Sequence, residues 1–360
     1  MKLIFVIESL GSGGAERQLV GLASMLKKRG YDVYVLTYYR EDFYKSILDD
    51  NKIPNEVYYG ALNRYLRFFR LSRRVNELSP DVTISFLPGP NVALGLAKIL
   101  GLLKSKLVVS ERNYTWNWTF KTRLYFSLYS KADAIVTNSK AEADNIKTEF
   151  PQYVSKVSFI QNFVDFERFK PQVCEHNGTF KIVTVARIID YKNVKGLITA
   201  ASILKKKGYL IEFDWFGNDY NDDYCFRVKK YIKEEGLEDV FKLKGPIKDI
   251  QNYYPMYDAF CLPSFKEGYP NVVVEAMSCQ LPILCSNICE NPVIVEDGIN
   301  GLLFNPHNVN EIVSSIEKMY SLTEKERREM GQRNREKVIK NNSINEFTDK
   351  YVDLIKGMTK

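Results

Sequence analysis

The sequence predicts an α/β protein of two domains, each a parallel sheet with helices on its faces. A strand followed by a helix begins at Lys2, and the same order begins again at Lys181. The predicted strands are short apolar runs, typical of parallel strands buried on both faces. A chain of 360 residues is long enough for two such domains. Glu8 interrupts the N-terminal apolar run, which therefore predicts a strand and no signal peptide.

The first domain is predicted over residues 1–170. Its first strand is followed by a glycine-rich turn that holds Gly13 and Gly14, a helix, and a second strand near 33–37. This order makes a right-handed βαβ unit, in which glycines let the backbone approach a ligand closely. The spacing is not G-x-G-x-x-G, and no acidic residue ends the second strand, so a dinucleotide site is not supported. A plain tight turn is the alternative.

The rest of the first domain continues the alternation. Further strands are expected at 82–87, 107–109, 133–137 and 158–160, with a helix from Val92 and another from Ala141 that Ser139 can cap. The strand at 107–109 ends in Glu111, Arg112 and Asn113, which are the polar candidates for this sheet edge.

A basic and aromatic segment, 62–78, is predicted to be one helix. Leu62, Tyr65, Leu66 and Phe69 fit one face, with five arginines around it: Arg64, Arg67, Arg70, Arg73 and Arg74. Such a helix can lie on an anionic lipid surface. It can equally be a surface helix whose arginine stems cover apolar neighbours.

The second domain is predicted over residues 178–343, after a polar linker at 171–179. Arg187 follows its first strand directly, and Lys192 comes five residues later. A helix over 194–206, a strand over 211–216 and a helix over 247–254 follow. Two fixed cations beside a helix N-terminus can stabilise a departing diphosphate without a metal.

Two glutamates are expected at the mouth of the second sheet. An apolar strand at 259–262 is followed by a loop with Glu267, a helix beginning near Pro270, and Glu275 within that helix. Open α/β sheets bind ligands where strands end and helices begin. No metal site is predicted, because Glu212 and Asp214 fall inside a strand pattern and the two histidines lie far from the clustered cysteines.

The segments S-F-K-E-G-Y-P-N-V-V-V-E-A-M-S and D-G-I-N-G-L-L-F, with the E-x7-E pair inside the first, resemble the family 4 retaining glycosyltransferases of the GT-B fold. The resemblance implies two facing Rossmann-like domains with a cleft between them, and a last helix, 344–358, packed on the first domain. It implies catalytic roles for Arg187, Lys192 and Glu267. The donor-binding residues that it implies are Gly13, Gly14, Gly268, Tyr269, Pro270, Asn271 and Glu275.

The same resemblance implies a division of labour between the glutamates, with Glu267 on the donor sugar and Glu275 on the ribose hydroxyls, which a carboxylate accepts from well. It places Glu111, Arg112 and Asn113 beside the acceptor, although many relatives have a histidine there. Phe163, Gln280 and Val293 also depart from the family pattern. The implied donor is a UDP-, GDP- or ADP-sugar, with UDP-sugar expected, and no metal or other cofactor.

Charge is unevenly distributed along the chain. The whole chain has a net charge of +7. Residues 1–170 hold 25 Lys and Arg against 17 Asp and Glu, so the whole positive excess lies in the first half of the chain. No nucleic-acid motif accompanies this excess, so an anionic membrane surface or a phosphate-bearing acceptor is expected instead of nucleic acid.

Together these features predict a retaining glycosyltransferase that moves a hexosyl or N-acetylhexosaminyl group to a glycan or a polyprenyl-diphosphate-linked acceptor. The expected process is bacterial surface polysaccharide synthesis, of capsule, exopolysaccharide or lipopolysaccharide. The expected location is cytoplasmic, peripheral at the inner face of the cell membrane. A catalytically inactive partner subunit of a two-chain transferase and a nucleotide-sugar epimerase on the same fold are the alternatives.

Overall fold

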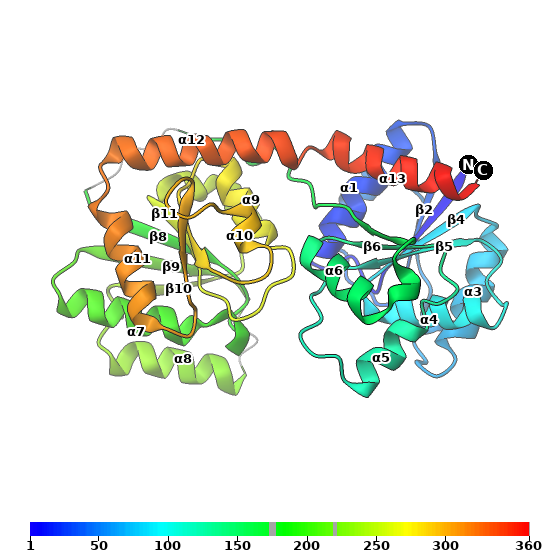
Figure 1. The fold of residues 1–360 in the computed structure, drawn as a ribbon, viewed down its shortest axis with the longest axis horizontal. Coiled ribbons are helices and arrows are strands. Elements are labelled where there is room, and N and C mark those ends of the chain that lie inside the picture. The colour runs from blue at the N-terminus through cyan, green and yellow to red at the C-terminus, as the bar shows by residue number, and fades with distance from the viewer. Residues whose placement is uncertain (173–177, 219–221, 360) are drawn as a thin grey trace. The chain divides into compact units, whose positions relative to one another are not determined.

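The protein, described here by a computed structural model, consists of two α/β units (Figure 1). The structure describes residues 1–172, 178–218 and 222–359. Unit 1 contains Met1–Phe163 and Asn342–Lys360, and unit 2 contains Val164–Asn341. Each unit is a Rossmann-like sheet between two layers of helices.

In the described part of the chain, unit 1 holds a seven-stranded parallel sheet in the order β3-β2-β1-β4-β5-β6-β7. Its strands are β1 (Lys2–Val6), β2 (Asp32–Thr37), β3 (Asn55–Val57), β4 (Val82–Phe86), β5 (Lys106–Glu111), β6 (Ala134–Thr137) and β7 (Val157–Phe159). Its helices are α1 (Gly14–Lys28), α2 (Lys45–Asp50), α3 (Arg67–Leu78), α4 (Pro88–Ile99), α5 (Phe120–Ser127), α6 (Lys140–Glu149) and α13 (Ile344–Thr359).

Successive side chains of each strand point to opposite faces of the sheet, which divides the core of unit 1 into two layers. Phe5 and its neighbours on one face pack with α1 and α13, whereas Ile4 and Val6 on the other face pack with α3, α4, α5 and α6. Phe347 and Tyr351 of α13 are buried among the side chains of α1, so the C-terminal helix belongs to this core.

Two helix starts in unit 1 differ from the sequence-based expectation. α3 begins at Arg67 and not at residue 62, because Asn63 accepts hydrogen bonds from the amides of Tyr65 and Leu66 and holds this segment in a turn. α4 begins at Pro88, since proline suits the first turn of a helix. Ser139 caps α6 as expected, accepting from the amide of Glu142 at 2.9 Å.

In the described part of the chain, unit 2 holds a six-stranded parallel sheet in the order β10-β9-β8-β11-β12-β13. Its strands are β8 (Phe180–Val185), β9 (Ile211–Phe216), β10 (Phe241–Gly245), β11 (Ala259–Leu262), β12 (Ile283–Ser286) and β13 (Gly301–Phe304). Its helices are α7 (Val194–Lys206), α8 (Asp223–Glu234), α9 (Asn271–Ser278), α10 (Asn291–Ile294), α11 (Val309–Ser321) and α12 (Glu324–Asn341).

The sheet of unit 2 also has two buried faces. α7, α8 and α11 pack on one face, and α9 and α12 contribute to the core on the other. The helix expected over 247–254 is two short 3-10 turns, Ile250–Asn252 and Tyr254–Met256. Pro255 explains the break, because proline has no N–H to donate to the carbonyl four residues earlier, as a continuous α-helix requires.

The first chain crossing between the units falls at residues 163 and 164. Residues 164–170, expected in the first domain, group with unit 2 because Val164 and Phe169 are buried in its core beside α9. Part of the expected linker, residues 173–177, lies outside the described residues.

Candidate active site

The candidate site of unit 2 lies at the point where the strand order reverses. The strands β9 and β10 are added on one side of β8, and β11, β12 and β13 on the other. β8 pairs in parallel with β9 on one side and with β11 on the other, so the carboxyl ends of all three strands meet at one edge. Arg187 and Lys192 follow β8, whereas Glu267 and Glu275 follow β11. Open α/β sheets bind ligands at such a reversal point.

The loop after β8 is held by close backbone packing. A Cβ at Gly217 would lie 1.8 Å from the carbonyl oxygen of Ala186, so only glycine fits after β9. The indole of Trp215 donates to the same carbonyl at 2.7 Å. Arg187 is exposed, and its Nη2 donates to the hydroxyl of Tyr191 at 2.7 Å. The backbone next to Arg187 is therefore fixed, while the Arg187 side chain is exposed.

Asn193 joins this loop to the loop after β11. Its backbone is left-handed, with φ of 57°, and its Oδ1 caps α7 by accepting from the amide of Gly196 at 3.1 Å. Its Nδ2 donates to the carbonyls of Pro263 at 3.1 Å and of Pro306 at 2.9 Å. The neighbouring amide of Phe265 donates to the carbonyl of Tyr191 at 2.8 Å, so the two loops are tied through their backbones.

This tie brings Lys192 and Glu267 together. The Nζ of Lys192 lies 2.5 Å from Oε1 of Glu267, and the two side chains are only 14% and 9% exposed. The ammonium group also lies 5.6 Å from the centre of the Tyr191 ring. Two of the residues expected to be catalytic thus form a partly buried ion pair across the carboxyl ends of β8 and β11.

The residues expected to bind the donor surround the start of α9. Tyr269 and Pro270 are buried, Gly268 and Asn271 are half-buried, and Glu275 lies one turn into α9 with 2% exposure. Pro270 precedes the helix and has no side-chain group that could cap the amides of its first turn. The amides of Asn271 and Val273 donate to the carbonyls of Tyr269 and Pro270, and the helix dipole favours an anion at this end of α9.

The candidates of unit 1 lie on separate elements. Gly13 precedes α1 with extended backbone, φ −76° and ψ 163°, and Gly14 is the first residue of that helix. A Cβ at Gly13 would lie 2.1 Å from Oε2 of Glu16, so the space beside Gly13 is occupied by that carboxylate. The glycine-rich turn ends at the helix N-terminus, as the sequence predicts.

Glu111 and Arg112 are enclosed by hydrogen bonds within unit 1. Glu111 accepts from Tyr129 and, at 3.0 Å, from Asn91 and Tyr125, and burial raises the pKa of its carboxyl group. Arg112 donates to Asn162 and to the hydroxyl of Tyr351, both at 2.8 Å, and burial lowers its pKa. Asn113 is exposed.

Three residues of the site in unit 2 were not singled out from the sequence. Tyr191 accepts from Arg187, Asn193 joins the two loops, and Phe265 stacks on His307 with ring centres 4.7 Å apart. Asn193 carried a signal, because asparagine tolerates left-handed backbone and is favoured before a helix. Nothing in the sequence pattern singled out Tyr191 or Phe265.

Comparison with known proteins identifies the family. The sequence profile described as "Glycosyl transferases group 1" matches residues 165–337, and the profile described as "Glycosyltransferase Family 4" matches residues 12–168. The chain belongs to the family 4 glycosyltransferases. The two matches cover the two units in turn, so this family 4 glycosyltransferase carries both halves that the family pattern describes.

Curated relatives of this glycosyltransferase are bacterial. An uncharacterized glycosyltransferase of Haemophilus influenzae is 28% identical over 333 residues, covering 88% of this chain and 89% of that protein. A Campylobacter jejuni relative is 27% identical over 320 residues and covers 84% of each chain. Its name is GalNAc-alpha-(1->4)-GalNAc-alpha-(1->3)-diNAcBac-PP-undecaprenol alpha-1,4-N-acetyl-D-galactosaminyltransferase.

Solved structures confirm the fold. The Anabaena protein HepE, crystallised with UDP and glucose, superposes with a TM-score of 0.85 at 20% identity, covering 99% of both chains. The glycosyltransferase therefore has the GT-B fold expected from its sequence. Among the helices of the described residues, none is both long enough and apolar enough to span a membrane.

Proposed function

We propose that this glycosyltransferase transfers a hexosyl or N-acetylhexosaminyl group from a UDP-sugar, with retention of configuration. The observation that carries the proposal is the Lys192–Glu267 ion pair at the strand reversal of unit 2, where Arg187 also follows β8. A UDP donor is further supported by HepE, a protein of the same fold that was crystallised with UDP and glucose.

Arg187 and Lys192 would hold the donor diphosphate, whose negative charge grows as the sugar departs. The N-terminus of α9 would add its dipole to this stabilisation. Glu267 would accept hydrogen bonds from the donor sugar, and Glu275 from the ribose hydroxyls. Gly13 and Gly14 would let the donor approach the backbone closely at the N-terminus of α1. Because the two cations neutralise the leaving group, we propose that transfer needs no metal.

The acceptor would be bound by unit 1 and would be a glycan or a polyprenyl-diphosphate-linked sugar of surface polysaccharide synthesis. The name of the Campylobacter relative, which includes diphosphate-linked undecaprenol, supports this acceptor class. Asn113 is the exposed member of the expected acceptor residues, whereas Glu111 and Arg112 would position this edge of β5 from within the core.

A lipid-linked acceptor places the enzyme at the inner face of the cytoplasmic membrane, and we propose that residues 59–70 of unit 1 contact the lipid. Five large side chains there are well exposed: Tyr59 at 55%, Leu62 at 45%, Tyr65 at 73%, Leu66 at 42% and Phe69 at 47%. Aromatic and aliphatic side chains beside arginines suit the headgroup boundary of an anionic bilayer.

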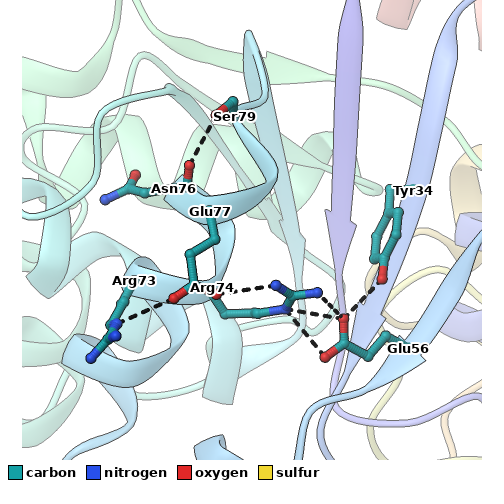
Figure 2. A network of polar contacts seen from close by, with 7 residues as sticks. All are labelled: Tyr34, Glu56, Arg73, Arg74, Asn76, Glu77 and Ser79. Atoms are coloured by element: carbon teal, nitrogen blue, oxygen red, sulfur yellow. Dashed lines mark hydrogen bonds and ion pairs between the residues drawn. The ribbon is translucent and has the colours of Figure 1, made fainter.

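The arginines of this surface do not all serve such binding. Arg74 is bonded to Glu56 through Nε and Nη2 and to Glu77 through Nη1, and Tyr34 donates to the same Glu56 (Figure 2). Arg67 donates to the carbonyl of Ala61 at 2.8 Å and lies over the Tyr38 ring at 4.3 Å. Arg67 within residues 59–70 and Arg74 beyond them are thus held by other residues of unit 1, and we propose Arg64 and Arg70 as the lipid contacts.

The two alternatives fit the site less well. An inactive partner subunit would not need Arg187, Lys192, Glu267 and Glu275 together at one sheet edge. An epimerase needs acidic groups for elimination and readdition, and the two glutamates of this edge are already assigned to sugar and ribose.

Thermal unfolding in the presence of UDP-, GDP- and ADP-sugars tests the donor. A ligand at ~100 times its dissociation constant raises the free energy of unfolding by about 2.7 kcal/mol. We expect UDP-sugars to raise the melting temperature and GDP- and ADP-sugars to leave it unchanged. Transfer from the stabilising donor to a polyprenyl-diphosphate-linked sugar then tests the acceptor, and transfer only to soluble glycans would refute the lipid carrier.

A further inference from the structure

The ammonium group of Lys192 is already neutralised in this structure. Its contact with Glu267 measures 2.5 Å, and both side chains are largely removed from solvent. A diphosphate needs the same ammonium group, because Lys192 is one of the two cations at this edge. Donor binding and the Lys192–Glu267 ion pair therefore compete for one charge.

Breaking the pair has a cost that depends on what replaces it. Partly buried charges are screened less than exposed ones, and a carboxylate that loses its cation inside a site is destabilised. When a phosphate oxygen takes Lys192, Glu267 needs new hydrogen-bond donors. The hydroxyl groups of a sugar can supply them, whereas a bare nucleoside diphosphate has no group beyond its terminal phosphate to do so.

The backbone around the pair is fixed, so the exchange is confined to side chains. The Phe265 amide is bonded to the Tyr191 carbonyl, and Asn193 is bonded to the Pro263 carbonyl. Tyr191 and Asn193 flank Lys192 in sequence, and Pro263 and Phe265 lie four and two residues before Glu267. The loops therefore cannot separate to relieve the unpaired carboxylate without losing these hydrogen bonds.

We infer that the Lys192–Glu267 ion pair makes the site discriminate between a nucleotide sugar and the bare nucleoside diphosphate. Glu267 raises the cost of holding the diphosphate alone, and the sugar removes that cost. The pair thus favours donor over product and speeds the release of the diphosphate after transfer. This inference rests on the proposed function, because it assigns the diphosphate to Lys192.

Calorimetry with UDP on the full-length chain tests the inference. Glu267→Gln keeps the size of the side chain but removes the competing charge, so UDP should bind about tenfold more tightly than to the wild type. Lys192→Met should weaken UDP binding. In the double variant the gain from Glu267→Gln should disappear, because no ammonium group is left to release.

The double variant distinguishes two causes of tighter UDP binding: release of the Lys192 ammonium group, and the mere loss of the negative charge of Glu267. If Glu267→Gln still tightens UDP binding when Lys192 is replaced, the gain comes from the loss of negative charge alone, and the inference is overturned. Asp214→Asn is the matched control, since Asp214 is also a poorly exposed carboxylate of unit 2, 3.5 Å from Lys244. It should leave UDP affinity unchanged.

The sugar completes the test. Titration with UDP-glucose, UDP-galactose and their N-acetylamino counterparts should show wild-type preference for a nucleotide sugar over UDP, reduced about tenfold by Glu267→Gln. Unchanged or weaker UDP binding by that variant, with an unchanged melting temperature, would overturn the inference alone. Failure of the wild type to bind any of these ligands would overturn the proposed function as well.

Discussion

Asn193 donates a hydrogen bond of 3.1 Å to the carbonyl of Pro263 and so connects the end of the β8 loop to the end of β11. Seventy positions separate the two residues in the sequence. Lys192 precedes Asn193 directly, and Glu267 lies four residues after Pro263. The bond therefore fixes the separation of the two charged groups through short, defined segments of backbone.

Asn193→Gly should loosen this arrangement. Glycine keeps the left-handed backbone without strain but loses the three side-chain hydrogen bonds, which we expect to cost about 2–3 kcal/mol of stability. Because catalytic groups would then be misplaced, kcat should fall roughly 10- to 100-fold. Transfer assays below the melting temperature of the variant check this. Lys52→Gly, at another left-handed position with φ of 52°, should leave kcat unchanged.

The sequence predicted the central elements well where apolar runs are bounded by turn residues. The strand at 259–262 and the helix over 194–206 have the bounds expected. Such segments are specified locally, by burial on both faces or by a regular apolar stripe. The expectation of a helix over 247–254 was wrong, because the apolar pattern is also compatible with two short turns. Pro255 favours the turns, since it has no N–H for a continuous α-helix.

The sequence predicts the candidate site as a set of residues but not as a geometry. Arg187, Lys192, Glu267 and Glu275 could be named from motif and spacing. The contact of Lys192 with Glu267 could not, because it depends on strand order and on the backbone bonds of Asn193 and Phe265. The burial of Arg112 likewise involves α13, whose Tyr351 is 239 positions from Arg112.

Loss of either cation should reduce transfer without abolishing folding. Arg187→Ala or Lys192→Ala should lower kcat roughly 100-fold or more, the usual effect of removing one group that stabilises transition-state charge. Activity of the wild type should persist in EDTA, because the proposed role of the two cations is to replace a metal. Inactivation by EDTA that Mg²⁺ or Mn²⁺ reverses would contradict this assignment.

Glu275→Gln should weaken the binding of UDP and of UDP-sugars alike. The proposed role of Glu275 is to accept hydrogen bonds from both ribose hydroxyls, and a neutral amide offers one acceptor instead of two oxygens. A loss of about tenfold corresponds to 1.4 kcal/mol, within the range for hydrogen bonds to a charged group. Calorimetry with 2′-deoxy-UDP provides the control. That ligand should bind wild type and variant with similar affinity.

Glu142 should make unit 1 less stable as the pH rises. Burial raises the pKa of its carboxyl group to about 7, although Thr115 and Asn145 donate hydrogen bonds to it. A raised pKa in the folded state means that stability is full below the unfolded value of 4.5 and is lost as the pH rises through 7. The difference corresponds to about 3 kcal/mol.

Urea unfolding of the wild type and of Glu142→Gln between pH 5 and pH 8 measures this effect. The wild type should lose more stability over this range than the variant, because the amide does not titrate. The buried Glu111 contributes in the same direction in both proteins, so the difference between them reports Glu142. Parallel pH profiles for the two proteins would show that Glu142 is ionised in the folded state throughout.

Membrane binding should depend on the exposed aromatic side chains of residues 59–70. The paired substitution Tyr65→Ser and Phe69→Ser should lower binding to anionic vesicles about tenfold, because both rings are well exposed and lie beside Arg64 and Arg70. Binding of the wild type should need anionic lipid and fall as salt rises, since each basic side chain near the surface contributes on the order of 1 kcal/mol. Vesicle co-sedimentation measures both effects.

Two control variants distinguish lipid binding by residues 59–70 from nonspecific hydrophobic binding and from loss of folding. Phe226→Ser removes an aromatic residue of unit 2 that is 70% exposed, and it should leave vesicle binding unchanged. Arg74→Gln should also leave binding unchanged while lowering stability by about 1 kcal/mol, because this arginine is held by Glu56 and Glu77. If the wild type does not sediment with anionic vesicles at low salt, residues 59–70 are a solvated surface and the acceptor is soluble.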